Sequence, residues 1–115
     1  MTSDSDRLDV VFTQLMLAGL QRLNREIGYR PTRFRRMVAD HGGVEAVRRL
    51  LIGRETSEGF ATLWAAQRLD LSVEAHVLLP RFESLFTDSE RSEARRRLVA
   101  HEFDVDAWLA GLGDQ

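Results

Sequence analysis

The sequence contains no cysteine and no lysine among its 115 residues. The absence of cysteine excludes disulfides, thiolate nucleophiles, and zinc or iron–sulfur sites built on thiolates. The absence of lysine leaves arginine as the source of all 16 basic side chains. A high-GC coding bias produces such a composition without selection for guanidinium chemistry, so the arginine content alone does not indicate a function.

Long apolar runs are also missing. The longest, LMLAGL, is far shorter than the roughly 18 residues that a membrane-spanning helix needs. The opening residues MTSDSDRLD are polar and acidic, which is atypical of signal and transit peptides. With 43% hydrophobic and 30% charged residues, the composition is that of a globular chain. We therefore expect a cytoplasmic protein with one compact domain over residues 1–115, frayed at 1–4 and 112–115.

Strand patterns are absent, whereas apolar residues recur at helical spacing along the chain. The sequence predicts an all-α fold of six or seven short-to-medium helices with a long N-terminal helix. Gly28 is expected to end the first helix in a left-handed conformation, and Thr87 with Glu90 forms a capping box. The predicted helices cover about 5–27, 32–41, 44–52, 57–68, 73–79 and 88–101, followed by a short last helix through Trp108 and Leu109. Ser72 is expected to cap the helix at 73–79, which Pro80 ends, and Asp104 is expected to cap the last helix.

Charge is distributed unevenly along the chain. Residues 1–54 carry ten arginines and six acidic residues, a net charge of +4. Residues 55–115 carry six arginines and twelve acidic residues, a net charge of −6. Such asymmetry favours an oriented contact with a charged partner or with a second copy of the chain.

The most basic segment is GYRPTRFRRM, at residues 28–37. Its arginines are Arg30, Arg33, Arg35 and Arg36. On a helix that begins near Pro31, Phe34 and Met37 share a face with Val38 and His41, and the arginines lie outside it. This arrangement is typical of the solvated side of a core-packed helix. A phosphate-binding patch has the same composition, although an inward Phe34 could not stack on a base. Both interpretations stay open.

Few residues offer metal or catalytic chemistry. Nothing in the sequence indicates that the histidines converge with carboxylates, as a zinc site would require. No serine stands in a nucleophile-elbow context. The three consecutive arginines Arg95–Arg97 point three ways around a helix, and we expect them on a salt-bridged surface where Glu93 reaches Arg96 and Arg97. We therefore expect no catalytic residue, no metal and no cofactor.

The two tryptophans lie in apolar helical segments. GFATLW, at residues 59–64, places Phe60, Leu63 and Trp64 on one helical face. Phe60 and Leu63 are predicted to be core residues. Trp64 is either a core residue or a partly exposed anchor of a protein interface, a role that tryptophan often has. Trp108 is expected to dock the last helix.

Several motifs recur with specific spacing over about residues 28–99. They are GYRPTRF, HGGVEAVRRLL, GFATLW and RLDLSVEAHVLLPRFESLFTDSE. Together they resemble a family of small bacterial helical domains of unknown function, whose pattern reads Y-x-P-x-x-F, HGG-x-x-A, LL, GF-x-x-LW, RLDLS-x-E and LFT-x-x-E. The chain departs from that pattern at Val47-Arg48, where Ala-Lys is more frequent. The resemblance implies no activity and no catalytic residues. Members occur alone and as tails on larger proteins, which favours binding over chemistry.

The sequence therefore predicts a non-catalytic interaction module that binds a protein partner. The candidate contact surface combines Tyr29, Arg30, Arg33, Arg35, Arg36 and Trp64. A first alternative is a nucleic-acid-binding accessory protein that contacts phosphates through the same four arginines, with an affinity that falls steeply with salt. A second alternative is a small enzyme or enzyme subunit, which would need a concave pocket with convergent polar groups.

Overall fold

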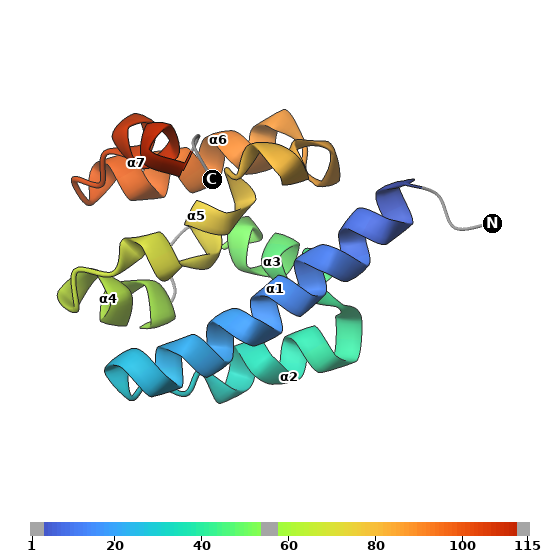
Figure 1. Cartoon of the computed structure of the whole chain (residues 1–115), viewed down its shortest axis with the longest axis horizontal. Helices are drawn as coiled ribbons and strands as arrows, with labels where there is room; N and C mark the ends of the chain where they lie inside the picture. The colour runs from blue at the N-terminus through green and yellow to red at the C-terminus, as the bar shows by residue number, and fades with distance from the viewer. Residues whose placement is uncertain (1–3, 54–57, 113–115) are drawn as a thin grey trace. The chain divides into compact units, whose positions relative to one another are not determined.

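The computed structural model of the chain describes residues 4–53 and 58–112. Within those ranges the chain forms seven α-helices, two short 3-10 helices and no strand (Figure 1). This confirms the all-α prediction with its long N-terminal helix. The elements are α1 (Asp4–Ile27), α2 (Thr32–His41), α3 (Gly43–Ile52), α4 (Glu58–Ala65), η1 (Leu69–Leu71), α5 (Val73–Val77), η2 (Pro80–Leu85), α6 (Asp88–Ala100) and α7 (Val105–Leu112).

The chain divides into two compact units, Met1–Arg54 and Glu55–Gln115. The first unit is therefore the part of the sequence with a net charge of +4, and the second unit is the part with a net charge of −6. Each unit has its own set of buried apolar side chains. The expectation of one domain over 1–115 stays a prediction. Of the residues predicted to fray, 1–3 and 113–115 lie outside the described ranges.

In the first unit, the apolar stripe of α1 forms the base on which α2 and α3 pack. The buried side chains of α1 are Phe12, Met16, Leu20 and Leu23, spaced three or four residues apart. Gly28 ends α1 as expected, with a φ of 67° and its N–H donating to the carbonyl of Asn24 over 3.0 Å. Only glycine adopts this left-handed conformation without strain.

The turn between α2 and α3 brings backbone unusually close to α1. Gly42 has a φ of 84°, and the N–H of Gly43 donates to Thr13 Oγ1 over 2.9 Å. A Cβ at Gly43 would lie 2.9 Å from the Thr13 Cα, closer than side chains approach a backbone. The absence of a side chain at position 43 therefore sets how tightly α3 approaches α1.

In the second unit, the predicted helix caps are confirmed. Thr87 Oγ1 accepts from the N–H of Glu90 over 3.0 Å, and Glu90 Oε1 accepts from the N–H of Thr87 over 2.8 Å. Ser72 caps α5 through the N–H of Ala75, and Asp104 caps α7 through the N–H of Ala107.

Two predicted helix ends in this unit are wrong. The helix expected to reach Arg68 ends at Ala65, because Gln67 adopts a left-handed φ of 60°. The helix expected to reach Leu79 ends at Val77, and Pro80 begins η2. Across the described helices, no segment has the length and apolar character needed to span a membrane.

Candidate functional site

The predicted arginine surface belongs to the first unit, and its four arginines are exposed. Arg30 Nε donates to Asn24 Oδ1 over 3.0 Å, and Arg36 pairs with Asp40 over 3.9 Å. Arg33 and Arg35 form no ion pair with any residue that the structure describes.

The neighbours of these arginines differ in their burial. Tyr29, just before α2, is partly buried. Phe34 and Met37 are also only partly buried, whereas Val38 is 3% exposed. His41, predicted on the same face, is exposed, because it ends the helix. The inward face of α2 is thus narrower than the sequence predicts, and the arginines lie on its solvent side.

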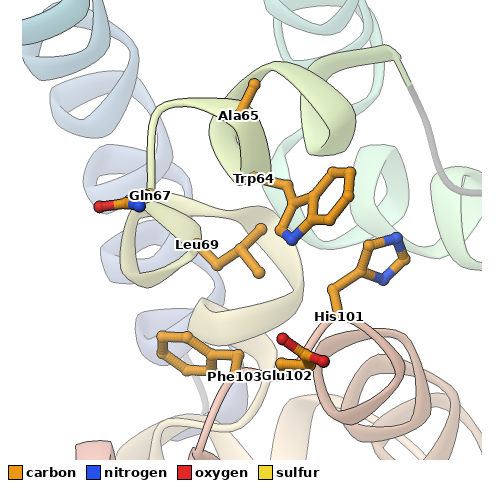
Figure 2. Close-up of a pocket in the computed structure, with 7 residues that line it drawn as sticks. All are labelled: Trp64, Ala65, Gln67, Leu69, His101, Glu102 and Phe103. Atoms are coloured by element: carbon orange, nitrogen blue, oxygen red, sulfur yellow. The ribbon is translucent and has the colours of Figure 1, made fainter.

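Trp64, the sixth residue of the predicted surface, belongs to the second unit. Its side chain is 53% exposed, so it is not a core residue. Phe60 and Leu63 on the same helix are buried, as predicted. Trp64 lines an open pocket of about 470 Å³ (Figure 2). The lining residues are Trp64, Ala65, Gln67, Leu69, His101, Glu102 and Phe103.

One wall of the pocket is the C-terminal end of α4. The N–H of Arg68 donates to the carbonyl of Leu63 over 2.8 Å, and the N–H of Gln67 donates to the carbonyl of Trp64 over 3.0 Å. This pair of bonds is a Schellman motif, in which the residue after the helix takes a left-handed conformation. Glycine usually occupies that position, but here it is Gln67, at a φ of 60°.

The opposite wall is the C-terminal end of α6, which has the same construction. The N–H of Phe103 donates to the carbonyl of Leu98 over 3.0 Å, and the N–H of Glu102 donates to the carbonyl of Val99 over 3.0 Å. Glu102 takes the left-handed position, with a φ of 63°. Among the described residues, Gln67 and Glu102 are the two non-glycine residues with positive φ, and both line this pocket. Such strain concentrates at functional sites.

His101 links the exposed Trp64 to the core. Its ring lies edge-on to both Phe60 and Trp64, with centroid distances of 4.8 and 5.2 Å. Its Nδ1 lies 2.8 Å from the carbonyl oxygen of Arg97. A carbonyl only accepts hydrogen bonds, so Nδ1 carries the proton and Nε2 of the neutral ring is an acceptor. These contacts fix the orientation of the imidazole beside Trp64.

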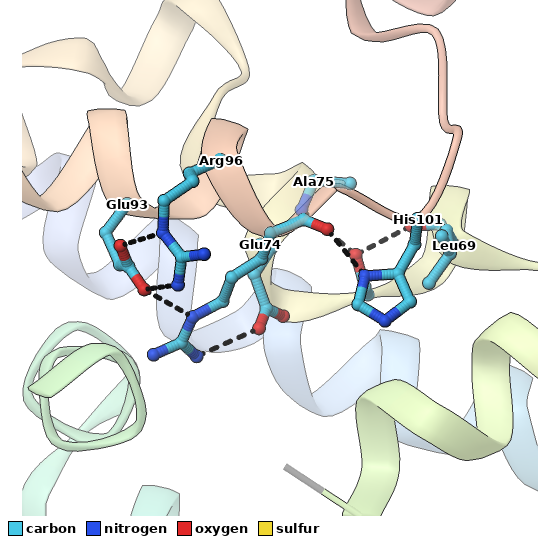
Figure 3. A network of polar contacts seen from close by, with 8 residues as sticks. Leu69, Glu74, Ala75, Glu93, Arg96 and His101 are labelled. Atoms are coloured by element: carbon cyan, nitrogen blue, oxygen red, sulfur yellow. Dashed lines mark hydrogen bonds and ion pairs between the residues drawn. The ribbon is translucent and has the colours of Figure 1, made fainter. Parts of the chain in front are cut away.

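On the same helix as the carbonyl that His101 contacts, an ion pair that the sequence did not predict joins α5 and α6 (Figure 3). Arg97 Nη1 lies 3.3 Å from Glu74 Oε2, and the two side chains are 1% and 4% exposed. Arg97 Nε also donates to Glu93 Oε1 over 3.0 Å, and Arg96 binds both oxygens of Glu93. The prediction that Glu93 reaches Arg96 and Arg97 is confirmed. The prediction that Arg97 lies on the surface is wrong, because the packing of α6 against α5 buries it.

The two carboxylates of this network are perturbed in opposite directions. Burial raises the pKa of Glu74 above its ordinary value, because the cost of desolvating the carboxylate exceeds the attraction of Arg97. The hydrogen bond from Arg96, together with Arg97, lowers the pKa of Glu93 from 4.5 to about 2. A buried carboxylate with a raised pKa can mark a catalytic site. Glu74, however, faces Arg97 and does not line the pocket, which indicates a structural role.

Most of the pocket could not be predicted from the sequence. Trp64 is the single lining residue that the sequence indicated as a contact. Gln67 and Glu102 went unrecognised because the helix ends that they form carry no glycine. A sequence signal for these helix ends is a polar residue followed closely by an apolar residue and an aspartate. Gln67 is followed by Leu69-Asp70, and Glu102 by Phe103-Asp104.

Comparisons with known proteins do not assign a family. No family model, no curated protein and no solved structure matches the chain. The resemblance to a small bacterial helical domain therefore stays a prediction. Within the described ranges, no group of three or more histidine or acidic side chains is placed to hold a metal ion.

Proposed function

We propose that the chain is a non-catalytic protein-binding module and that the pocket beside Trp64 is its contact site. The observation that carries this proposal is the exposure of Trp64. A tryptophan 53% exposed at the rim of a pocket of about 470 Å³ leaves a large apolar surface in water. Tryptophan is enriched among the residues that dominate binding energy at protein interfaces.

The contacts that hold Trp64 in place favour a binding role for its exposed indole. The edge-on contact with His101 and the hydrogen bond from His101 to the carbonyl of Arg97 hold the surroundings of the indole in one geometry. A preorganised anchor loses little conformational entropy when a partner binds. Gln67 and Glu102, beside the same pocket, adopt a left-handed backbone conformation that costs some stability.

The composition of the lining favours binding over catalysis. The pocket contains one imidazole, one carboxylate and one amide, from His101, Glu102 and Gln67. The described lining residues carry no hydroxyl, thiol or amine that could act as a nucleophile. Nδ1 of His101 donates to the backbone carbonyl of Arg97, so no carboxylate orients this imidazole as one does in a catalytic triad.

The experiment is a quantitative capture of proteins from a lysate of the source organism, with and without nuclease. Immobilised wild-type chain is compared with Trp64→Ala and with the triple variant Arg33→Ala/Arg35→Ala/Arg36→Ala. We expect Trp64→Ala to lose a specific, nuclease-resistant partner that the triple variant retains. Circular dichroism would check that both variants keep their helices. Retention of every partner by a folded Trp64→Ala variant would overturn the proposal.

A second candidate function is phosphate binding by α2. The observation that favours it is that Arg33 and Arg35 are exposed and form no ion pair with a described residue, while the first turn of α2 carries no acidic residue. A nucleic-acid contact of this kind should lose affinity with a log–log salt slope of about −0.9 for each duplex phosphate neutralised. Fluorescence anisotropy with a labelled duplex at several salt concentrations measures that slope, and the triple arginine variant should reduce it.

A further inference from the structure

The pocket beside Trp64 lies where two helices end. Ala65 ends α4, Ala100 ends α6, and the residues that follow both ends line the pocket. The C-terminus of an α-helix carries a partial negative charge, because its last carbonyls point out of the helix. Hydrogen bonds at the turns cap several of these carbonyls, but the aligned peptide dipoles still place partial negative charge at both helix ends, which favours a cation.

The carboxylate of Glu102 adds a full negative charge to this lining. Glu102 is exposed, and within the part of the chain that the structure describes its side chain has no hydrogen-bond or ion-pair partner. The nearby acidic side chains Asp70 and Asp106 are already paired, with Arg68 and Arg95. Residues 55–115 as a whole have six arginines and twelve acidic residues, which strengthens the attraction of a cation to this unit.

Aromatic and apolar groups complete the lining. Figure 2 shows Trp64 and Phe103 on two sides of Leu69, with the carboxylate of Glu102 between Phe103 and His101. The face of an indole attracts cations, and a planar guanidinium stacks on it as well. The apolar stem of a long basic side chain fits along the partly exposed Phe103 while its charged head reaches Glu102.

From these observations we propose that the pocket takes an arginine side chain from a basic segment of the partner protein. Arginine fits better than lysine, because its planar guanidinium can stack on Trp64 and bond to a carboxylate with two parallel N–H groups. This inference rests on the proposed function and specifies the chemistry of the group that is bound.

The test uses the full chain labelled with nitrogen-15 and follows the indole Nε1–H resonance of Trp64, which Trp64→Phe identifies. The ligands are N-acetyl-arginine methylamide and its lysine and citrulline counterparts, titrated at constant ionic strength. Citrulline has nearly the shape of arginine but no charge. We expect a saturable shift with arginine, a weaker response with lysine, and an affinity for citrulline lower by about tenfold or more.

Two carboxylate-to-amide variants separate the pocket from the overall charge. Glu102→Gln removes the charge in the lining, and Glu83→Gln removes the same charge from an exposed side chain outside it, at the cost of a 3.7 Å pair with Arg91. We expect Glu102→Gln to weaken arginine binding by about tenfold and Glu83→Gln to leave it nearly unchanged.

Three outcomes would overturn this inference. The first is equal affinity for citrulline and arginine, and the second is an equal loss of arginine affinity in Glu102→Gln and Glu83→Gln. The third is a concentration-dependent dimer in sedimentation that Glu102→Gln abolishes, because the occupant would then be a second copy of the chain. If citrulline binds as well as arginine while Trp64→Ala still loses its protein partner, the arginine assignment fails and the proposed function stands. If Trp64→Ala loses nothing, the proposed function itself fails.

Discussion

Arg97 and Glu74 form an ion pair that is almost completely removed from solvent, with 3.3 Å between Nη1 and Oε2. Arg97 lies on α6 and Glu74 on α5, so the pair joins two helices that also pack through apolar side chains. The backbone carbonyl of Arg97 in turn accepts the hydrogen bond from His101, beside Trp64. The candidate site and the core of the second unit therefore meet at one residue.

Removing Arg97 should destabilise the chain strongly. Arg97→Met would leave Glu74 as a buried carboxylate without its partner, and we expect the free energy of unfolding to fall by about 3–5 kcal/mol. Urea denaturation followed by circular dichroism measures this change. Arg96→Met, at a neighbouring side chain that is 59% exposed, is the matched control and should cost much less than Arg97→Met.

The same pair allows a second comparison. Because the cost of Arg97→Met arises from the unpaired charge of Glu74, the double variant Glu74→Leu/Arg97→Met should be more stable than Arg97→Met alone. A double variant that is less stable would show that packing of the arginine stem, and not its charge, dominates at this position.

The stability of the chain should depend on pH through Glu93. Its pKa is lowered from 4.5 to about 2 in the folded chain, mainly by the hydrogen bond from Arg96. A lowered pKa means that the unfolded chain binds protons first, so the contribution of Glu93 is fully present above pH 4.5 and is lost as the pH falls from 4.5 to about 2. Glu93→Gln should flatten the fall in unfolding free energy over that interval.

The measurement is urea denaturation of wild-type and Glu93→Gln chains at several pH values. Glu74 acts in the opposite direction, because its raised pKa makes stability fall as the pH rises above the ordinary value of 4.5. The difference between wild type and Glu93→Gln separates Glu93 from the other carboxylates except Glu74, whose pKa the charge of Glu93 helps to raise. An identical pH dependence in both chains would contradict the assignment.

The fold was predictable because most helices follow simple apolar and capping patterns. The stripe from Phe12 to Leu23 and the capping box at Thr87 both have local causes, and the structure confirms them. The wrong helix end at Gln67 has no such local signal. Gln67 takes a backbone conformation that the residue itself disfavours, so only tertiary packing could reveal it.

The candidate site was harder to predict, because its residues become neighbours only in the fold. Trp64 and His101 are far apart in sequence, and no motif links one to the other. Charged residues are usually exposed, so a run of three arginines indicates a surface. Arg97 is an exception because α6 has few apolar residues, and its buried side chains are Ala94, Arg97 and Leu98. Helical spacing does place Arg97, and not Arg95 or Arg96, on the face of Ala94 and Leu98, but its charge argued against burial.

Phe34 should contribute less to stability than a fully buried phenylalanine. Phe12 in the same unit is 0% exposed, and Phe12→Ala should cost about 3–5 kcal/mol. Phe34 is only partly buried, so Phe34→Ala should cost clearly less, although more than Arg35→Ala, which is expected to be nearly neutral. Thermal denaturation of the three variants gives this order. Equal costs at Phe34 and Phe12 would mean that α2 packs more deeply than the partial exposure of Phe34 indicates.

Two glycines in the first unit should respond oppositely to replacement by alanine. At Gly43 the new Cβ would lie 2.9 Å from the Thr13 Cα and 3.3 Å from Phe12 Cδ1, so α3 would have to move away from α1. We expect Gly43→Ala to cost about 1–3 kcal/mol, as overpacking does. At Gly19, inside α1, a Cβ would meet nothing within 4 Å. Gly19→Ala should therefore stabilise the chain by about 0.5–1 kcal/mol, because alanine restricts the unfolded chain and favours the helix.

Urea denaturation of both glycine variants measures this opposition. The hydrogen bond from the Gly43 N–H to Thr13 Oγ1 offers a further control, because Thr13→Val removes the acceptor and keeps a similar shape. Since Thr13→Val leaves the backbone of α1 in place, it should not relieve the clash of Gly43→Ala, which is mainly with the Thr13 Cα. If Gly43→Ala proved neutral in the wild-type background, the close approach of α3 to α1 could not be a constraint on the fold.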